Sequence, residues 1–379
     1  MLSSIQRSQR VPASRPWAAR LSGLALVIAL LGLLVPAGAS AMSKGLMDEE
    51  LARSDDQTLR DAFFTIAQGS NVKFTRTFIN WDGKFAFPYP HEVERAVRVA
   101  REGVSRGIDT VFVSFNGELG THYKDAKKVN LKRYRTMVER TVQQMHAELK
   151  GVDVRLVWSP WNEANYQTQL PKKNGPATWR KMQNAAYAAV KKHAPKDLVV
   201  AGELAPYARS TAKSSNPGPF LREALGLDKS WRSRKGTRAK DYSIKADAIT
   251  LHSYDYLVDP RRRLSSKDKW TIRNLSTTRS LLKRAARTKR ISGTAAKRLY
   301  ITEFAYIFKP VEPAKPSSQT IADETGATWL KYAWDIAKRN QIRGFLWFNV
   351  RDPQAIFFSG LVDANNRARP ALAAFQALK

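Results

Sequence analysis

Two glutamates of this 379-residue chain stand next to short apolar runs of the sequence. Glu163 follows "LVWSPWN" at 156–162, and Glu303 lies within "RLYITEFAY" at 298–306. A carboxylate beside a buried segment is costly unless it is solvated, paired or used in a reaction. Two carboxylates that face each other across a cleft can hydrolyse a glycosidic bond. For this chemistry we predict Glu163 as the acid and then the base, and Glu303 as the nucleophile.

Such chemistry requires a fold that brings distant parts of the chain together. Short β-branched or aromatic runs alternate with longer helical segments along the sequence. The runs predict eight strands, at 45–49, 71–81, 109–117, 153–159, 197–205, 246–254, 298–306 and 342–350. The segments between them predict helices at 54–67, 91–103, 134–150, 178–193, 219–225, 270–288, 325–340 and 368–378. Strict alternation indicates a parallel sheet with crossover helices.

The predicted fold class is α/β. Eight units in a chain of this length favour a closed (β/α)8 TIM barrel, which we expect to form one domain over 42–379. An open doubly wound sheet is the structural alternative. Its dinucleotide-binding version is disfavoured, because no Gly-x-Gly-x-x-Gly turn follows an early strand. In a barrel the carboxyl ends of all strands surround one opening, so Glu163 and Glu303 would meet there.

Other residues near the predicted strand ends suit the binding of a sugar. Aromatic rings can stack on sugar C–H groups, and Asn162 can donate a hydrogen bond to a sugar 2-hydroxyl. Charge and hydrogen bonds from the arginine, histidine and tyrosine of this set can hold Glu303 in its ionised form. The predicted substrate-binding residues are Asn162, Arg76, Trp81, His252, Tyr254, Tyr306 and Trp347.

Three motifs together resemble a known group of enzymes. They are "WNEAN" at 161–165, "ITEFAY" at 301–306 and "GFLWFNV" at 344–350, and they are similar to motifs of the clan A glycoside hydrolases, particularly families 5 and 39. The resemblance extends over 45–379. It implies a retaining (β/α)8 enzyme that acts on an oligo- or polysaccharide by double displacement.

The resemblance also implies roles for two residues at strand ends. Asn162-Glu163 corresponds to the asparagine–glutamate pair that ends the fourth strand, in which the glutamate is the acid/base. Glu303 corresponds to the nucleophile at the end of the seventh strand. Both assignments agree with the chemistry argued from the residues alone.

Further positions follow the same resemblance. His252 and Tyr254 match the sixth-strand pair, Trp347 matches the sugar platform of the eighth strand, and Arg76 resembles the second-strand arginine near the nucleophile. One position departs from the pattern, because Ala164 stands where the family has proline. The family proline restrains the turn after the acid, so this change is expected to loosen that turn without removing a reacting group.

Each glutamate also has a simpler explanation. Glu163 could be a solvated loop carboxylate or a partner for nearby lysines, and Glu303 could form a salt bridge with Arg343 or Arg351. Either explanation is reasonable alone. Both together, at the two matching strands, are much less so.

The sequence gives little reason to expect a metal or a cofactor. The chain has no cysteine, which excludes thiolate ligands and thiol nucleophiles. Asp82, Glu118 and His252 lack the spacing of a metal-ligand set. Glu118 and Glu203 are weaker catalytic candidates, for which we expect surface or supporting roles. We predict no metal and no cofactor.

The chain carries a formal net charge of +31. Such a charge can attract nucleic acid, an anionic surface or a polyanionic substrate, or it can reflect a basic composition only. No zinc-finger or RNA-binding signature accompanies it, so we expect no nucleic-acid partner. Attachment to an anionic cell envelope or an acidic polysaccharide is favoured over nucleic-acid recognition, and a basic composition without any charge effect is favoured over both. The protein is expected to be a monomer.

The N-terminal residues predict export. Four arginines within 7–20 precede the uncharged apolar stretch 21–35, and small residues follow at 37, 39 and 41. This is the pattern of a secretory signal peptide, here 1–41. A retained membrane anchor is the alternative, although the stretch is shorter than the roughly 20 residues of a spanning helix.

Two functions from different classes fit these observations. The first is a secreted retaining glycoside hydrolase that cleaves β-linked substrates. The second is a non-catalytic barrel that binds anionic cell-envelope polysaccharide through the same cleft. Two intact carboxylates favour the enzyme, because a binding protein needs neither.

Overall fold

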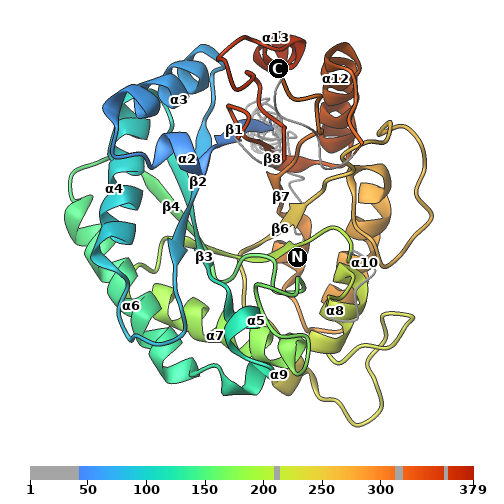
Figure 1. Ribbon diagram of the computed structural model, residues 1–379. Helices are drawn as coiled ribbons and strands as arrows, with labels where there is room; N and C mark the ends of the chain where they lie inside the picture. Colours follow the sequence, from blue (N-terminus) through green and yellow to red (C-terminus); the bar gives the residue numbers. More distant parts are fainter. Residues whose placement is uncertain (1–41, 209–213, 312–318, 354–356) are drawn as a thin grey trace, which may run out of the picture. The chain divides into compact units, whose positions relative to one another are not determined.

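Eight parallel strands close into a barrel in the computed structural model of the chain (Figure 1). The strands are β1 (Ser43–Met47), β2 (Phe74–Asn80), β3 (Thr110–Asn116), β4 (Arg155–Ser159), β5 (Leu198–Leu204), β6 (Ala248–His252), β7 (Leu299–Glu303) and β8 (Ile342–Phe348). They follow one another around the barrel in sequence order. The predicted (β/α)8 fold is confirmed, and every strand overlaps its predicted range.

The structure describes residues 42–208, 214–311, 319–353 and 357–379. The predicted signal peptide at 1–41 lies outside these residues. Met42–Lys379 form one compact unit. Within the described ranges, no helix combines the length and the apolar character needed to span a membrane.

Helices surround the strands on the outside of the barrel (Figure 1). Those that correspond to predicted helices are α3 (Gln57–Gly69), α4 (Pro90–Ser105), α6 (Leu131–Glu148), α7 (Gly175–His193), α8 (Pro217–Ala224), α10 (Leu275–Arg287), α12 (Asp323–Arg339) and α13 (Pro370–Ala377). The short helices α2 (Glu49–Ala52), α5 (Leu119–His122), α9 (Ala239–Tyr242) and α11 (Gly293–Lys297) were not predicted.

Helix α4 illustrates why the amphipathic segments pack where they do. It begins at Pro90, whose missing N–H costs nothing in the first turn. Val93, Ala96, Val97 and Ala100 repeat at helical spacing and are all buried. Their common face therefore covers the outside of the barrel, while the charged residues between them face solvent.

The barrel interior has an apolar floor. Alternate residues of a strand point to the same side, so the inward positions of the eight strands meet inside the barrel. The buried members of this inner cluster are Met47, Phe74, Phe112, Val157, Val200, Ala248 and Leu346. Phe74 needs a glycine neighbour, because a Cβ added to Gly45 would lie 2.3 Å from its ring. The polar residues of the site stand next to this floor, on the same inner face.

Candidate active site

Glu163 lies in a turn just beyond the end of β4. Its backbone is left-handed, with φ of 39°. Its N–H donates to the carbonyl oxygen of Glu203 across 2.8 Å, and its own carbonyl accepts from the N–H of Tyr166 at 2.7 Å. The turn is thus tied to the neighbouring strand β5 as well as to itself.

Asn165 fixes the turn that the family proline would otherwise restrain. Its side-chain oxygen accepts from the N–H of Ala205 at 2.8 Å. Its side-chain amide donates to the carbonyls of Ala205 at 3.0 Å and Ser215 at 2.8 Å. Ala164 is itself buried between these contacts. The expectation of a looser turn at Ala164 finds no support in this hydrogen-bonding pattern.

Glu303 ends β7 and has a partner on each oxygen. Arg76 of β2 donates to Oε1 at 2.5 Å, and the Tyr254 hydroxyl donates to Oε2 at 2.9 Å. Neither Arg343 nor Arg351 is the ion-pair partner, so that simpler explanation of Glu303 is excluded. The two donors orient the carboxylate as predicted for Arg76 and Tyr254.

The two predicted catalytic carboxylates meet inside the barrel opening. One oxygen of Glu163 and one of Glu303 lie within 4.8 Å of each other, with a nitrogen of His252 inside the same radius. The His252 Nδ1 atom is 2.9 Å from Glu163 Oε1 and 3.5 Å from Glu303 Oε2. The fold therefore joins residues that are 140 positions apart in the sequence.

The two carboxylates have different surroundings. Burial raises the pKa of Glu163 to about 7, and the nearby negative charge of Glu203 adds to the rise, although Arg76 opposes it. Glu303, by contrast, is directly ion-paired. A carboxyl that still carries its proton near neutral pH beside one that is held by a cation is a suitable pair for acid and nucleophile.

His252 is wholly buried at the end of β6. Burial lowers its pKa, and Arg76 acts in the same direction, whereas Glu303 and Glu203 oppose the fall. The imidazole is therefore neutral at neutral pH. A neutral ring can either donate or accept at Nδ1, so one proton can be shared between His252 and Glu163.

Arg76 connects most of the polar side chains of the site. Its guanidinium donates to Ser114 at 2.9 Å, to Asn162 at 2.9 Å and to Glu203 at 2.9 Å, in addition to Glu303. Burial alone would lower the pKa of Arg76, but Glu203 and Glu303 outweigh it and raise that pKa. The guanidinium is a permanent positive charge at the centre of the site.

Glu203 belongs to the buried part of the site, which excludes the surface role that was one of its two expected roles. It was expected at the surface or in a supporting role, and it is wholly buried, with φ of 47°. A register shift in β5 at Gly202 directs its side chain inward, and a Cβ on Gly202 would lie 2.1 Å from the Thr250 carbonyl oxygen. Burial raises the pKa of Glu203, but Arg76 and His252 outweigh it, so the pKa is lowered.

Three of the predicted aromatic residues direct their polar atoms to backbone carbonyls elsewhere, not to the two carboxylates. Trp81, Tyr306 and Trp347 are at most 2% exposed and belong to the main apolar cluster of the domain, in which the helices also take part. The Trp347 indole donates to the Ser359 carbonyl, and its ring stacks on Phe308. A ring enclosed in this way offers no face to a sugar.

Phe348 occupies the place that was predicted for Trp347. It is partly exposed and packs against the inner cluster of the barrel, on the opposite side of β8 from Trp347. Its ring lies edge-on to Tyr254 at 6.4 Å. The strict alternation of side chains along a strand was the signal that could have selected Phe348.

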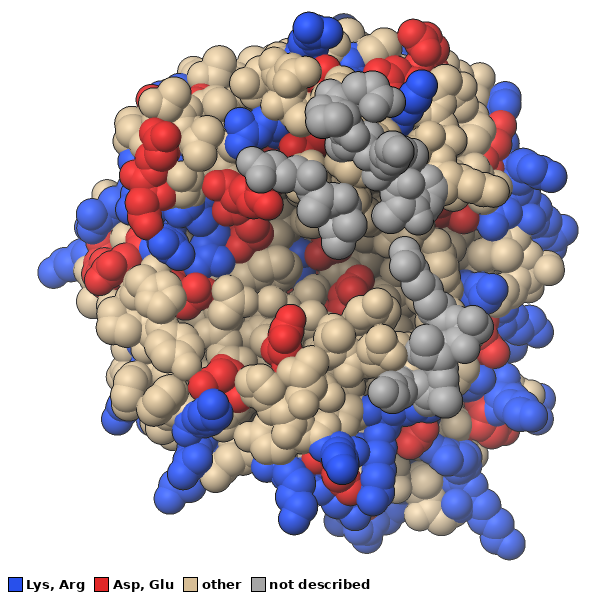
Figure 2. Space-filling model, in the orientation of Figure 1, with Lys and Arg blue, Asp and Glu red and all other residues tan. Residues whose placement is uncertain are grey.

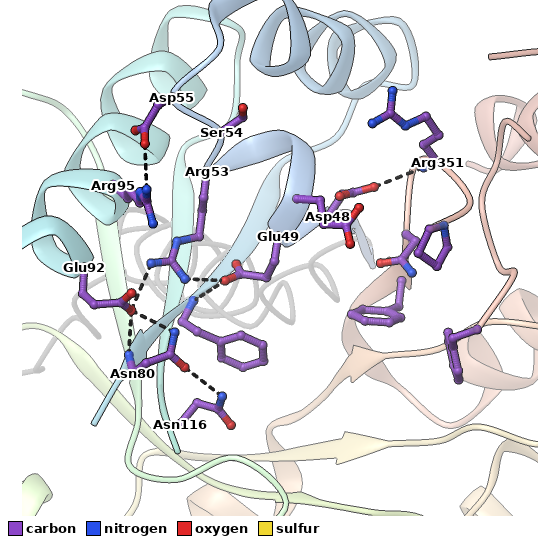
Figure 3. A pocket seen from close by; sticks show the side chains of 16 residues that line it. Asp48, Glu49, Arg53, Ser54, Asp55, Asn80, Glu92, Arg95, Asn116 and Arg351 are labelled. Carbon is purple, nitrogen blue, oxygen red and sulfur yellow. Dashed lines mark hydrogen bonds and ion pairs between the residues drawn. The ribbon is translucent and has the colours of Figure 1, made fainter. Parts of the chain in front are cut away.

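A pocket of about 790 Å³ opens at the carboxyl ends of β1, β2, β3 and β8, and neither Glu163 nor Glu303 lines it (Figure 3). Its walls come from the ends of β1, β2, β3 and β8, from α2 and from α4. The lining residues are Asp48, Glu49, Glu50, Arg53, Ser54, Asp55, Phe78, Asn80, Glu92, Arg95, Asn116, Phe348, Asn349, Arg351, Pro353 and Phe357. Figure 2 shows acidic side chains within a central hollow on this face of the molecule, with most basic side chains toward its edge.

Hydrogen bonds link this pocket to the catalytic carboxylates. Arg53 pairs with Glu92, which accepts from the amide side chain of Asn80 (Figure 3). Asn116 donates to Asn80 at 2.9 Å and accepts from Asn162 at 3.2 Å. Because Asn162 also accepts a hydrogen bond from Arg76, a continuous series of hydrogen bonds connects the pocket to Arg76 and Glu303.

One group of described residues has the composition of a metal site. Glu163, His252 and Glu303 each offer a ligand atom within 4.8 Å of the others, and Asp82 and Glu118 are not part of that group. Each of the three takes part in the hydrogen bonds or close contacts given above, but the buried Nε2 atom of His252 has no hydrogen-bond partner among the described residues. The absence of a metal and of a cofactor stays a prediction.

Comparisons with known proteins agree on the fold. No protein-family model matches the sequence, and no curated protein sequence matches it. Among solved structures, a family 39 glycoside hydrolase from the gut symbiont Bacteroides cellulosilyticus WH2 aligns with a TM-score of 0.60 at 15% identity, covering 90% of this chain and 64% of that one. The chain thus spans less than two thirds of that enzyme.

Two other solved structures give similar results. A monomeric beta-xylosidase from Caulobacter crescentus CB15 aligns with a TM-score of 0.58 at 15% identity, covering 88% of this chain and 67% of that one. A family 5 xyloglucanase from Paenibacillus pabuli aligns with a TM-score of 0.56 at 12% identity, covering 89% and 98%. The structural neighbours are therefore clan A glycoside hydrolases of families 39 and 5, the group that the motifs resemble. At these identities the likeness establishes the barrel fold.

Proposed function

We propose that this protein is a glycoside hydrolase that cleaves a β-linked oligo- or polysaccharide with retention of configuration. The observation that carries the proposal is the approach of Glu163 and Glu303, whose nearest carboxylate oxygens lie within 4.8 Å. Retaining enzymes place their carboxyl groups about 5–5.5 Å apart, and inverting enzymes about 6.5–9.5 Å apart to admit a water molecule. The observed approach is nearer to the spacing of retaining enzymes, and it supports that mechanism.

The first half of the reaction uses both carboxyl groups. A Glu303 oxygen attacks the anomeric carbon while the bond from that carbon to the leaving-group oxygen breaks. Glu163 gives its proton to the departing oxygen, which leaves as an alcohol. The sugar is then attached to Glu303 through an ester bond, and Glu163 is ionised.

The second half restores the enzyme. Ionised Glu163 removes a proton from a water molecule, and the resulting hydroxide oxygen bonds to the anomeric carbon. The ester bond to Glu303 breaks, and its electron pair returns to the carboxylate. Two inversions give net retention.

The surrounding residues support these steps. Arg76 and Tyr254 orient Glu303 for attack and receive its oxygens again when the ester breaks. His252 contacts both carboxylates and can move a proton to or from Glu163. Asn162 is held by Arg76 and by Asn116, which lines the pocket, and it is the residue predicted to bind a sugar 2-hydroxyl.

The decisive experiment combines activity with identification of the intermediate. A panel of aryl β-glycosides and β-linked oligosaccharides is screened with residues 42–379, and the anomer formed first is identified by proton NMR. A 2-deoxy-2-fluoro glycoside of the preferred sugar should label Glu303, as read by mass spectrometry of peptides. Release of the opposite anomer, or label on another residue, would refute the retaining mechanism.

A second candidate is a barrel that binds anionic envelope polysaccharide without cleaving it. The net charge of +31 favours this function. It predicts no hydrolysis by the wild type and equal glycan binding by the wild type, Glu163→Gln and Glu303→Gln. Hydrolysis that both substitutions abolish would exclude it.

We also propose that the protein is exported and loses 1–41 on the way. The basic, apolar and small-residue regions of this segment support export. Expression of the full chain in a bacterial host, followed by N-terminal sequencing of the exported protein, tests the proposal. Recovery of the uncleaved chain in the membrane fraction would favour a retained anchor instead.

A further inference from the structure

Two carboxylates and one side-chain amide share one arginine at the centre of this site. Glu303 and Glu203 both form ion pairs with Arg76, at 2.5 and 2.9 Å. The side-chain oxygen of Asn162 accepts a hydrogen bond from the same guanidinium. In the described part of the chain, no arginine or lysine pairs with Glu163, whose partner is His252. A single counter-charge would be enough for Glu303, so Glu203 is a buried negative charge in excess of what the ion pair needs.

Glu203 also occupies a demanding position. It is wholly buried, its φ of 47° is unfavourable for a residue with a side chain, and a buried carboxylate is costly even when it is paired. Its Oε1 accepts from the Ser114 hydroxyl at 3.2 Å, which in turn binds Arg76. Both features lower the stability of the folded state, so a role beyond packing is expected for Glu203.

We propose that Glu203 is a positioning residue that keeps the Glu163 carboxyl protonated until the reaction needs its proton. Its ion pair with Arg76 partly neutralises the positive charge that would otherwise stabilise an ionised Glu163. Its own negative charge also disfavours a second negative charge on Glu163. The inference rests on the proposed function, because it assigns Glu163 the role of acid.

The backbone brings the two glutamates together. The Glu163 N–H donates to the Glu203 carbonyl oxygen at 2.8 Å, which fixes the end of β4 against the end of β5. The electrostatic relations agree in sign, since Glu203 raises the pKa of Glu163 whereas Arg76 lowers it. Without the Glu203 charge, the increase that it causes in the Glu163 pKa is lost. Arg76 then has one carboxylate fewer to neutralise it, so it lowers the Glu163 pKa more strongly.

Other charged groups around Glu163 do not substitute for Glu203. His252 of β6 is neutral and hydrogen-bonds to Glu163, Glu303 of β7 is paired with Arg76, and Tyr254 binds Glu303 as an uncharged phenol. These residues are the titratable groups that the neighbouring strands present to Glu163. Among them, Glu203 is the negative charge whose removal leaves the predicted reacting groups intact.

The test is a direct titration of the carboxyl groups. Protein labelled with carbon-13 at the glutamate carboxyl is titrated by NMR, and the Glu163 signal is assigned with Glu163→Gln. The expected result is that Glu203→Gln lowers the titration midpoint of Glu163 by about one pH unit or more. Glu118→Gln, at an exposed glutamate beyond β3, is the matched control and should leave the midpoint unchanged. An unchanged midpoint in Glu203→Gln would overturn the inference.

Kinetics separate this role from a structural one. At pH 7, Glu203→Gln should reduce kcat/KM about tenfold on a phenyl glycoside, whose leaving group needs the acid. It should have little effect on a dinitrophenyl glycoside, whose leaving group departs without a proton. Equal losses on both substrates would indicate a general distortion of the site and refute the positioning role.

Two further measurements keep the outcomes distinct. If Glu203→Gln does not fold, the wild-type titration decides, because Glu203 must be ionised at every pH at which Glu163 titrates. A protonated Glu203 at pH 6 would overturn the inference. If the wild type cleaves no glycoside but the Glu163 midpoint still falls in Glu203→Gln, the proposed function fails while the electrostatic relation between the two residues stands.

Discussion

Arg76 and Glu303 form an ion pair of 2.5 Å between β2 and β7, and the side chain of Arg76 is wholly buried. The same guanidinium pairs with Glu203 of β5, so one cation links three strands across the interior of the barrel. Its removal would leave two buried carboxylates without a counter-charge. We therefore expect the pair to matter for folding as well as for the proposed reaction.

Arg76→Met should destabilise the protein severely. Breaking a buried ion pair by removing one partner costs about 3–5 kcal/mol, because the remaining charge stays buried. Urea unfolding followed by circular dichroism measures the loss. Arg343→Met is the control, since Arg343 is exposed and has no ion pair among the described residues. A loss no larger than that of the control would mean that Glu203 and Glu303 are neutral in the folded state.

The activity should fall as the pH rises through about 7. Glu163 must carry its proton to serve as the acid, and its pKa is raised to about 7. Above that pH, kcat/KM should decrease about tenfold per pH unit. Glu163→Gln should lose this basic limb together with about 10²–10⁴-fold of the rate on a poor leaving group. A basic limb that persists in Glu163→Gln would assign the titration to another group.

Glu163→Gln should be more stable than the wild type at alkaline pH. An unfolded glutamate loses its proton near 4.5, whereas folded Glu163 holds it to about 7. The contribution of this carboxyl to stability is therefore fully present below pH 4.5 and is lost as the pH rises to 7. The gain from glutamine should be near zero at pH 4.5 and on the order of 3 kcal/mol at pH 8. Urea unfolding at pH 4.5, 6 and 8 measures it, and a pH-independent difference would contradict the expectation.

Substitutions at two adjacent residues of β8 should differ in their effects on KM and on stability. Phe348→Ala opens the wall of the pocket, so KM should rise several-fold with little change in stability. Trp347→Phe leaves the pocket intact but removes volume and a hydrogen bond from a closed cluster, so stability should fall by roughly 1–3 kcal/mol while KM changes little. Comparison of KM and urea midpoints for both variants measures this. A larger KM effect at Trp347 would restore its predicted role as the sugar platform.

The fold was largely predictable from the sequence because the strand and helix signals are local. Apolar runs such as 109–117 and amphipathic segments such as 91–103 carry their own periodicity, and eight alternating units admit few topologies. The short helix α2 escaped prediction because four residues are too few to show a helical period. It matters nonetheless, because it carries Glu49 into the pocket.

The site was predictable only where a residue type is informative by itself. Glu163 and Tyr254 were named at the ends of predicted strands, and Arg76 and Glu303 within them. The family resemblance supported all four, and the fold brings them together. The burial of Glu203 was not predictable, because the β5 irregularity that turns it inward depends on contacts with β6, which no local pattern reveals.

The aromatic residues show a second limit of the sequence analysis. Neighbouring positions of a strand face opposite sides, and an error of one position selects the wrong ring. Trp347 was chosen for its type, whereas Phe348 has the inward orientation. Register is a property of the whole sheet, so the choice between them needed the structure.

The pocket lies across the junction between the first and last strands of the barrel. β1 and β8 pair from Ser43↔Gly344 to Met47↔Phe348, and the pocket walls continue from both strands through Asp48 and Asn349. A ligand seated there would bridge segments from opposite ends of the domain. Binding would then oppose separation of this junction by mass action, so ligand concentration should slow proteolysis that starts at either end of the domain.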